Sequence, residues 1–217
     1  MATKVSPSLL AADFLNLGKE IEMINTSEAD WLHLDIMDGM FVPNISFGFS
    51  VLEALPKVLQ KPMDVHFMIM HPEDYIERTA RLGAMSMNVH VEACGEKTAE
   101  VLEKITAAGM KAAVTVSPDT PIEAVRPYLN KVHMVLIMGV HPGFGGQKFI
   151  PATLDRVREL KHIIEETGEN VLIQVDGGVD SVTAPELVAA GCDVLVSGSY
   201  VFKANDPYAT IRQLRSL

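Results

Sequence analysis

Short runs of β-branched and apolar residues alternate along the chain with longer segments in which apolar residues recur every three to four positions. The short runs are typical of buried strands and the longer segments of amphipathic helices. Strands are predicted at residues 4–10, 31–37, 63–69, 87–93, 111–117, 134–140, 171–177 and 193–199. Helical periodicity is clearest at 16–24, 102–109, 152–166 and 184–191, and glycines at C-cap positions close several such segments (Gly83, Gly109, Gly168 and Gly191).

This alternation of eight strands with about eight helices predicts an α/β fold with a parallel sheet and helical crossovers. At 217 residues, the best solution is a closed (β/α)8 TIM barrel that forms a single catalytic domain over residues 1–217. A doubly wound open sheet is the second choice. Catalytic groups in such barrels lie at the C-terminal ends of the strands, so we expect the active site at that end.

Composition excludes several kinds of partner. The formal net charge of -10 opposes general binding to nucleic acid or to an anionic membrane, because phosphate backbones require clustered Lys and Arg. No stretch reaches the roughly 18 apolar residues of a membrane span, and the first residues lack the features of a signal peptide. Cys94 and Cys192 are far apart and suggest neither a disulfide framework nor a cysteine zinc site. We expect a cytoplasmic protein that holds any phosphate locally.

Polar residues interrupt the predicted strands near their C-terminal ends. In HLDIMDG (33–39), His33 and Asp35 share one face of a strand at a spacing of roughly 6.6 Å. His66 comes late in the third strand and Asp176 ends the seventh. Any one of these residues alone could be a hydrogen-bonded core group, but four at one rim favour a site. Two imidazoles and two carboxylates suit zinc, iron, manganese or cobalt better than magnesium or calcium.

Glycines gather at the ends of the last three predicted strands. HPGFGGQKF (141–149) has three glycines in four positions, which suits a loop whose backbone N–H groups cradle phosphate. By itself this stretch could be an ordinary tight loop. VDGG (175–178) and SGSYVF (197–202) follow the next two strands, where barrels of this class frequently bind phosphate. Together they predict a phosphate pocket built from backbone amides and Ser199.

Seven blocks resemble the signature blocks of the D-ribulose-5-phosphate 3-epimerase family and run in family order over essentially the whole chain. They are SPSLLAADF, HLDIMDGMFVPN, DVHFMI, HVEA, PGFGGQKFIP, VDGG and SGSYVF. The resemblance implies a metal-dependent (β/α)8 barrel that interconverts ribulose 5-phosphate and xylulose 5-phosphate in the pentose phosphate pathway. It also implies a homo-oligomer with one divalent metal ion per subunit.

The resemblance further implies a role for each matching residue. The metal ligands would be His33, Asp35, His66 and Asp176, with Asp35 and Asp176 as the catalytic acid/base pair. The residues in contact with the phosphosugar would be Ser8, His66, Gly143, Phe144, Gly145, Gly146, Asp176, Gly177, Gly178, Gly198 and Ser199. Met37, Met68 and Met138 would flank an enediolate, although plain core filling is an alternative for these side chains.

The chemistry of the reaction agrees with two acid/base residues. Inversion at carbon 3 beside a ketone removes a proton from one face and returns one to the other, so two groups must stand on opposite sides of the substrate. Asp35 on the second strand and Asp176 on the seventh are well separated around the ring. A metal that polarises the substrate oxygens would let a weakly basic carboxylate suffice.

Three positions depart from the family pattern. Gly139 stands where the family usually has Ser, His141 where it has Asn, Asp or Glu, and Phe67 where Leu is common.

Three other functions stay open. One alternative is a 3-epimerase of a hexulose phosphate such as allulose 6-phosphate. Decarboxylation or Schiff-base aldol cleavage would require a lysine inside the rim, and the strand lysines lie at strand beginnings. A noncatalytic phosphosugar-binding barrel would tolerate the loss of either aspartate.

Overall fold

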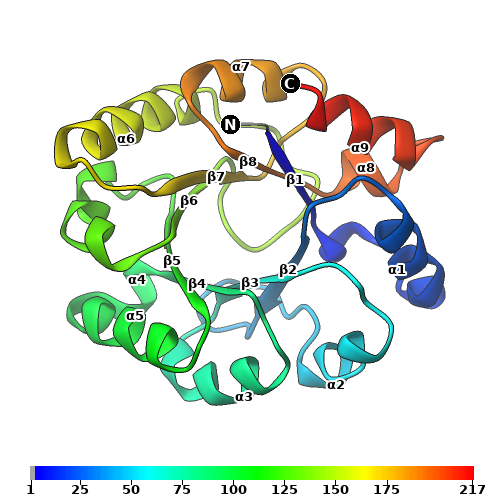
Figure 1. Cartoon of the computed structure of the whole chain (residues 1–217), viewed down its shortest axis with the longest axis horizontal. Helices are drawn as coiled ribbons and strands as arrows, with labels where there is room; N and C mark the ends of the chain where they lie inside the picture. The colour runs from blue at the N-terminus through cyan, green and yellow to red at the C-terminus, as the bar shows by residue number, and fades with distance from the viewer. Residues whose placement is uncertain (1–2) are drawn as a thin grey trace.

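Eight parallel strands form a ring around the centre of the molecule, as Figure 1 shows. The computed structural model describes residues 3–217. The strands are β1 (Lys4–Pro7), β2 (Leu32–Met37), β3 (Met63–Met68), β4 (Ser86–His90), β5 (Lys111–Val116), β6 (Met134–Met138), β7 (Leu172–Asp176) and β8 (Val194–Ser197). Each strand from β2 to β7 pairs in parallel with the next, and β8 pairs with β1. A bridge between Ser8 and His33 joins β1 to β2, which closes the predicted (β/α)8 barrel.

Helices surround the ring of strands on the outside (Figure 1). The α-helices are α1 (Leu17–Thr26), α2 (Phe49–Leu52), α3 (Ile76–Arg81), α4 (Val91–Cys94), α5 (Thr98–Ala107), α6 (Thr153–Thr167), α7 (Thr183–Ala190), α8 (Ser199–Phe202) and α9 (Pro207–Arg215). Between β5 and β6 the chain forms a 3-10 helix, Ile122–Lys131, in place of an α-helix. Pro127 within it has no N–H to donate, which disfavours a regular α-helix there. No helix within residues 3–217 is long and apolar enough to cross a membrane.

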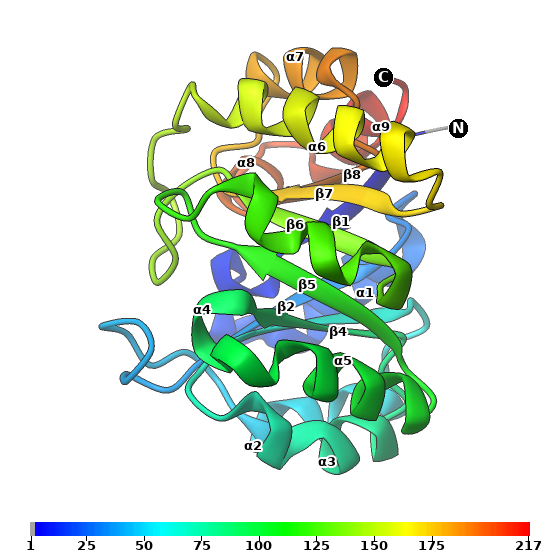
Figure 2. The same cartoon turned by 90° about the vertical axis from the view of Figure 1, so that its left-hand side faces the viewer.

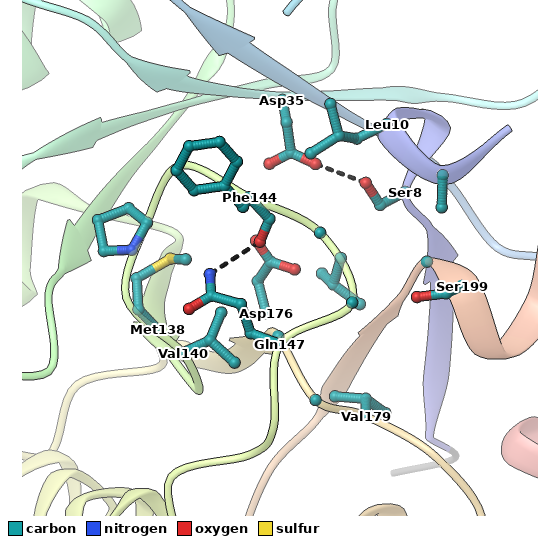
Figure 3. A pocket seen from close by; sticks show the side chains of 18 of the residues that line it. Ser8, Leu10, Asp35, Met138, Val140, Phe144, Gln147, Asp176, Val179 and Ser199 are labelled. Atoms are coloured by element: carbon teal, nitrogen blue, oxygen red, sulfur yellow. Dashed lines mark hydrogen bonds between the residues drawn. The ribbon is translucent and has the colours of Figure 1, made fainter. Parts of the chain in front are cut away.

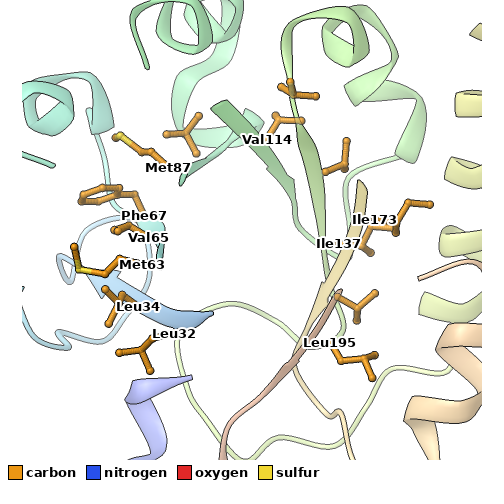
Figure 4. Close-up of a cluster of buried hydrophobic side chains, with 14 of the residues drawn as sticks. Leu32, Leu34, Met63, Val65, Phe67, Met87, Val114, Ile137, Ile173 and Leu195 are labelled. Carbon is orange, nitrogen blue, oxygen red and sulfur yellow. The ribbon is translucent and has the colours of Figure 1, made fainter. Parts of the chain in front are cut away.

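The main hydrophobic core lies between the strands and the helices. Apolar side chains on the outer face of the strands form this layer, and Figure 4 shows examples from β2, β3, β5 and β7, among them Leu34, Val65, Val114 and Ile173. Phe67 is fully buried in the same layer and stacks on Tyr75. The change at Phe67 from the usual Leu is therefore a packing change outside the barrel. The inner face of the strands carries the buried polar groups together with smaller apolar clusters, such as Ala113 with Met134 and Leu136 with Met138.

Most of the predicted strands end one to three residues earlier in the structure than their sequence patterns suggested. The strand predicted at 87–93 stops at His90, because Val91 begins α4. The HVEA block therefore spans a strand-to-helix junction at the C-terminal end of the barrel. The long loops after β2 and β6 project from the same end, on the left in Figure 2. The predicted functional rim is thus assembled from strand ends and the loops that follow them.

Candidate active site and metal centre

Four side chains at the C-terminal end of the barrel converge on one small volume. His33 and Asp35 come from β2, His66 from β3 and Asp176 from β7, and one ligand atom from each lies within 4.8 Å of all the others. His33 Nε2 lies 3.3 Å from Asp35 Oδ1 and 3.9 Å from Asp176 Oδ2. His66 Nδ1 lies 3.0 Å from Asp35 Oδ1 and 3.8 Å from Asp176 Oδ2. The structure therefore brings together all four residues predicted to ligate a metal.

The two carboxylates reach this volume from opposite sides. In Figure 3, Asp35 enters from β2 at the top and Asp176 from β7 across the cavity. The Ser8 hydroxyl donates a hydrogen bond of 2.5 Å to Asp35 Oδ2, which fixes the orientation of that carboxylate. Asp35 is almost fully buried, whereas Asp176 keeps about 15% of its side-chain surface exposed to the cavity. The arrangement presents the two carboxylates from opposite sides to any molecule bound in the cavity that both of them line.

The surroundings push the proton affinities of the two carboxylates apart. Burial, followed by the negative charge of Asp35, raises the pKa of Asp176 to about 7. Burial also acts to raise the pKa of Asp35, but the charge of His33 and the hydrogen bonds from His33 and His66 outweigh it and hold that pKa well below its usual value. Pairs of titratable groups whose pKa values are driven apart are typical of acid/base sites. A divalent cation would relieve the repulsion between these carboxylates.

The donor set fits a borderline transition metal. Two imidazole nitrogens and two carboxylate oxygens are the ligands that zinc, iron, manganese and cobalt share, and magnesium and calcium prefer all-oxygen shells. The second ring nitrogen of each histidine, Nδ1 of His33 and Nε2 of His66, has its own hydrogen-bond partner on the side away from the cluster. Burial lowers the pKa of His66 to about 4, so its ring is neutral and a nitrogen lone pair is available for a metal.

A buried carboxylate beneath the cluster orients His33. Asp64 on β3 accepts a 2.8 Å hydrogen bond from His33 Nδ1, which leaves Nε2 facing the other ligands. Asp64 also accepts hydrogen bonds from three fully buried neighbours, Ser86, Asn88 and Gln174. Such outer carboxylates fix the tautomer of ligand histidines. Asp64 is not among the residues predicted from the sequence, although the DVH run repeats the two-residue spacing of HLD and indicates a second polar pair on one strand face.

A cavity of about 480 Å³ opens above the cluster. It is lined by all the residues predicted to contact the substrate except His66, and by the three predicted methionines: Ser8, Asp35, Met37, Met68, Met138, Gly143, Phe144, Gly145, Gly146, Asp176, Gly177, Gly178, Gly198 and Ser199. His33 and His66 are fully buried beneath this lining. Lys148, which was left outside the predicted set, also lines the cavity. It is a cation on the glycine-rich loop.

Contacts between loops shape the mouth of the cavity. Asn44, on the loop after β2, donates a 2.7 Å hydrogen bond to the carbonyl of Gly143 on the loop after β6. Gln147 donates to the carbonyls of His141 and Phe144, which closes the glycine-rich loop on itself (Figure 3). His141 is largely exposed at the rim, with Nδ1 3.6 Å from Asp119 Oδ2. This departure from the family pattern therefore lies at the mouth of the cavity, away from the carboxylates of Asp35 and Asp176.

The other departure, Gly139, is explained by a close approach of two backbones. Gly139 donates a 2.6 Å hydrogen bond to the carbonyl of Asp176, and a Cβ on Gly139 would overlap the carbonyl oxygen of Gly177. The segment after β6 therefore packs directly on the backbone that carries Asp176. Any side chain at position 139 would have to move one of these segments.

Gly139→Ala is therefore expected to displace Asp176. Overpacking of this kind costs about 1–3 kcal/mol of unfolding free energy. A small misplacement of a reacting group can also lower kcat by about 10-fold to 100-fold. Denaturant unfolding and steady-state kinetics measure both effects. Gly18→Ala is the matched control, because nothing lies within 4 Å of a Cβ at Gly18. Parental stability and kcat in Gly139→Ala would contradict this account of the close approach.

Comparison with known proteins gives a consistent picture. Residues 4–202 match the model of the "Ribulose-phosphate 3 epimerase family". The chain is 43% identical over 98% of its length to the ribulose-phosphate 3-epimerase of Bacillus subtilis, of which it covers 98%. It is 47% identical to that of Rhodobacter capsulatus, over 92% of this chain and 86% of the relative. It is also 40% identical to a cytoplasmic isoform from Oryza sativa subsp. japonica, over 99% of this chain and 93% of the relative.

More distant solved structures share the fold. A 3-hexulose-6-phosphate synthase superposes with a TM-score of 0.68 at 21% identity, over 99% of this chain and 98% of the other. KGPDC from Streptococcus mutans superposes with a TM-score of 0.73 at 13% identity, over 99% and 96%. At these identities the likeness extends to the barrel architecture alone.

Proposed function

Because the chain belongs to the ribulose-phosphate 3-epimerase family, we propose that its cavity interconverts D-ribulose 5-phosphate and D-xylulose 5-phosphate, with Asp35 and Asp176 as the acid/base pair. The chain is an isomerase, an epimerase that acts on a carbohydrate. The observation that carries the proposal is the placement of these two carboxylates on opposite sides of one cavity, above two buried imidazoles. Within this proposal, residues 1–217 act as one catalytic domain.

The proposed mechanism transfers a proton on each face of the substrate. One aspartate removes the carbon-3 proton of the bound ketose, which leaves an enediolate, and the other aspartate delivers a proton to the opposite face. The two residues exchange roles in the reverse direction, so each must work as an acid and as a base. The pKa of Asp176, raised to about 7 by burial and by Asp35, lets that residue hold or release a proton near neutral pH.

The four clustered side chains, His33, Asp35, His66 and Asp176, would hold one divalent metal ion in each subunit. Zinc, iron, manganese and cobalt all fit this donor set. When bound, such an ion supplies Lewis-acid stabilisation of negative charge on the substrate oxygens. Ser8 keeps the Asp35 carboxylate oriented toward this centre through its short hydrogen bond. The predicted substrate contact from His66 stays a prediction, because its ring is buried beneath the cavity lining.

Three methionines would keep water away from the reacting carbons. Met37, Met68 and Met138 end β2, β3 and β6, line the cavity and are almost fully buried. Their polarizable, apolar side chains would pack against a planar enediolate and exclude solvent that could quench it.

The phosphate group would lie across the loops that follow β6, β7 and β8. Gly143 to Gly146, Gly177, Gly178, Gly198 and Ser199 all line that side of the cavity. Gly178 adopts a φ of +69°, and a Cβ there would lie 2.6 Å from Cα of Phe149. Only glycine lets these loops meet while their backbone N–H groups stay open to a ligand. Lys148 adds a positive charge near this end of the cavity.

Ser199→Ala is expected to weaken phosphate binding. A hydrogen bond to a charged group contributes about 1.5–3 kcal/mol, so KM for the phosphosugar should rise at least about 10-fold while kcat stays close to the parental value. Steady-state kinetics measure both constants. Ser216→Ala, near the C-terminus and far from the cavity lining, is the control. A fall in kcat at unchanged KM would place Ser199 elsewhere in the reaction.

The alternatives are weaker. The three curated relatives described above are all ribulose-phosphate 3-epimerases, so a hexulose phosphate is not favoured as substrate. Among the cavity-lining residues within 3–217, lysine occurs at Lys148 alone, on the loop ten residues past the end of β6. That is not the strand-end position of a Schiff-base lysine. Both aspartates are present, which a noncatalytic barrel would not need.

The proposed function is tested by offering ribulose 5-phosphate and allulose 6-phosphate to the purified protein in parallel. We expect proton NMR to show xylulose 5-phosphate forming, with a larger kcat/KM for the pentulose. Faster turnover of the hexulose phosphate would make that sugar the substrate in place of ribulose 5-phosphate. If metal-replete protein turned over neither sugar, the proposed epimerase activity would be overturned.

We further propose a homo-oligomer in the cytoplasm. The rice relative is described as a cytoplasmic isoform. No nucleic-acid or membrane partner is proposed, in keeping with the formal net charge of -10. Light scattering tests the assembly, because a monodisperse species of 23.7 kDa would show a monomer and contradict it.

A further inference from the structure

His66 is linked, on the side away from the metal cluster, to a second histidine and then to a carboxylate. His66 Nε2 lies 3.0 Å from His90 Nε2, and the two rings stack with centroids 5.1 Å apart. His90 Nδ1 lies 3.1 Å from Oε2 of Glu92. Both histidines are fully buried, whereas Glu92 at the start of α4 is partly exposed. The row therefore runs from the centre of the barrel to its rim.

The hydrogen-bond roles along this row can be assigned from its outer end. Glu92 Oε1 accepts a 2.8 Å hydrogen bond from the backbone N–H of Ser117, and Oε2 faces His90. An ionised carboxylate only accepts, so the proton of a neutral His90 must sit on Nδ1. Ser117 Oγ, 3.3 Å from the same nitrogen, can share that N–H. Although burial opposes it, hydrogen bonds from His90 and Thr120 hold the pKa of Glu92 at about 2, which keeps it ionised.

The assignment then passes to His66. With its proton on Nδ1, His90 presents only a lone pair at Nε2, so His66 must donate from Nε2 across the 3.0 Å contact. A neutral imidazole carries one N–H. His66 Nδ1 lies 3.0 Å from Asp35 Oδ1 and would donate to that ionised carboxylate when no metal is bound. With a metal on the cluster, the proton that His66 keeps on Nε2 leaves Nδ1 unprotonated, and it is this nitrogen that faces Asp35 and Asp176.

We propose that Glu92 is a positioning residue for the metal centre: acting through His90, it holds His66 in the tautomer whose Nδ1 lone pair is available as a ligand. This inference rests on the proposed function, because it requires that the cluster binds a metal. It gives His66 the same kind of support that Asp64 gives His33 directly. Each ligand histidine is then oriented by one carboxylate outside the ligand set.

Glutamine cannot replace Glu92 in this arrangement. Two N–H groups, from His90 and from Ser117, converge on the carboxylate, and an amide offers only one oxygen. An amide nitrogen turned toward His90 moves the His90 proton to Nε2, where it meets the N–H of His66. Relief of that contact moves the His66 proton to Nδ1 and removes the lone pair from the ligand set. The opposite orientation sets the amide nitrogen against the backbone N–H of Ser117.

The tautomers can be read directly in the parental protein. Long-range 15N–1H NMR of the zinc-loaded, full-length chain is expected to show His90 protonated at Nδ1 and His66 protonated at Nε2. This measurement needs no variant, so it does not depend on how a substitution folds. A proton on Nε2 of His90 in the zinc-loaded protein would overturn the proposal.

Zinc affinity supplies the second readout. In a chelator competition titration, Glu92→Gln is expected to bind zinc about 10-fold to 100-fold more weakly than the parent, as is typical when an outer partner of a ligand histidine is lost. Glu100→Gln, the same chemical change at an exposed residue of α5 paired with Lys104, should match the parent. An unchanged zinc dissociation constant in a folded Glu92→Gln protein would overturn the proposal.

A double-mutant cycle separates positioning from simple loss of negative charge. In a His90→Asn background, the connection is already broken, so adding Glu92→Gln should cost no further zinc affinity. The same fold-loss in both backgrounds would show that Glu92 acts by charge alone and would overturn the inference. Failure of the parent itself to bind zinc would overturn the proposed metal centre along with it, whereas a zinc-binding parent confines any failure to Glu92.

Discussion

Asp176→Asn is expected to lower kcat for ribulose 5-phosphate by about 10³-fold, in line with the contribution of a positioned general acid/base. Asparagine keeps the shape of the side chain but can neither take nor give the proton at carbon 3. Asp35 enters the cavity from the opposite side. In the proposed mechanism it therefore serves the other face of the substrate and cannot substitute. Steady-state kinetics at saturating metal measure the loss.

Folding must be separated from chemistry in this variant. Asp176 is at the end of β7 and is partly exposed to the cavity, so the substitution should leave cooperative unfolding intact. Asp155→Asn, an exposed residue of α6, makes the same chemical change away from the site and should keep parental kcat. Retention of more than about a tenth of parental kcat by metal-saturated Asp176→Asn would remove Asp176 from the acid/base pair.

Removal of the divalent metal is expected to abolish turnover, with a loss of about 10³-fold or more. Lewis-acid stabilisation of developing charge contributes several kcal/mol, and each 1.4 kcal/mol is tenfold in rate. In addition, the repulsion between Asp35 and Asp176 is then unrelieved, which disturbs both acid/base groups. The experiment is dialysis against a chelator, metal analysis and an assay before and after re-addition.

The choice of metal checks the donor set. Zinc, iron, manganese or cobalt should restore turnover, and magnesium at the same concentration should not, because two of the four donors are imidazoles. A chain that is stripped of metal, verified by elemental analysis, and still turns over at the parental rate would contradict the proposed centre.

The barrel and the four clustered residues could be predicted from the sequence for physical reasons. Strand periodicity places side chains on alternate faces, so His33 and Asp35 had to share one face of β2, and parallel strands bring their C-terminal ends to one rim. His66 and Asp176 are at matching heights on β3 and β7, and the structure places all four within 4.8 Å. These features depend only on local pattern and on the fold class.

Other parts of the site depend on contacts that a single sequence does not carry. Asp64 supports His33 because the register of β2 and β3 sets these residues side by side. Glu92 reaches His90 only because β4 ends at that histidine and turns at once into α4. The need for glycine at Gly139 comes from the approach of the Gly177 carbonyl, which depends on how two loops pack. Register, strand ends and loop packing are set by the whole fold.

The central claim is that two aspartates transfer protons on opposite faces, and deuterium incorporation tests it most directly. The parental protein would convert ribulose 5-phosphate in deuterium oxide, and proton NMR would follow carbon 3 of the first product formed. Each carboxyl carries a single proton, so the proton removed on one face is not the one returned on the other. We expect xylulose 5-phosphate to carry deuterium at carbon 3 from the first turnovers. Product that retains the substrate's own hydrogen at carbon 3 would contradict the two-base mechanism.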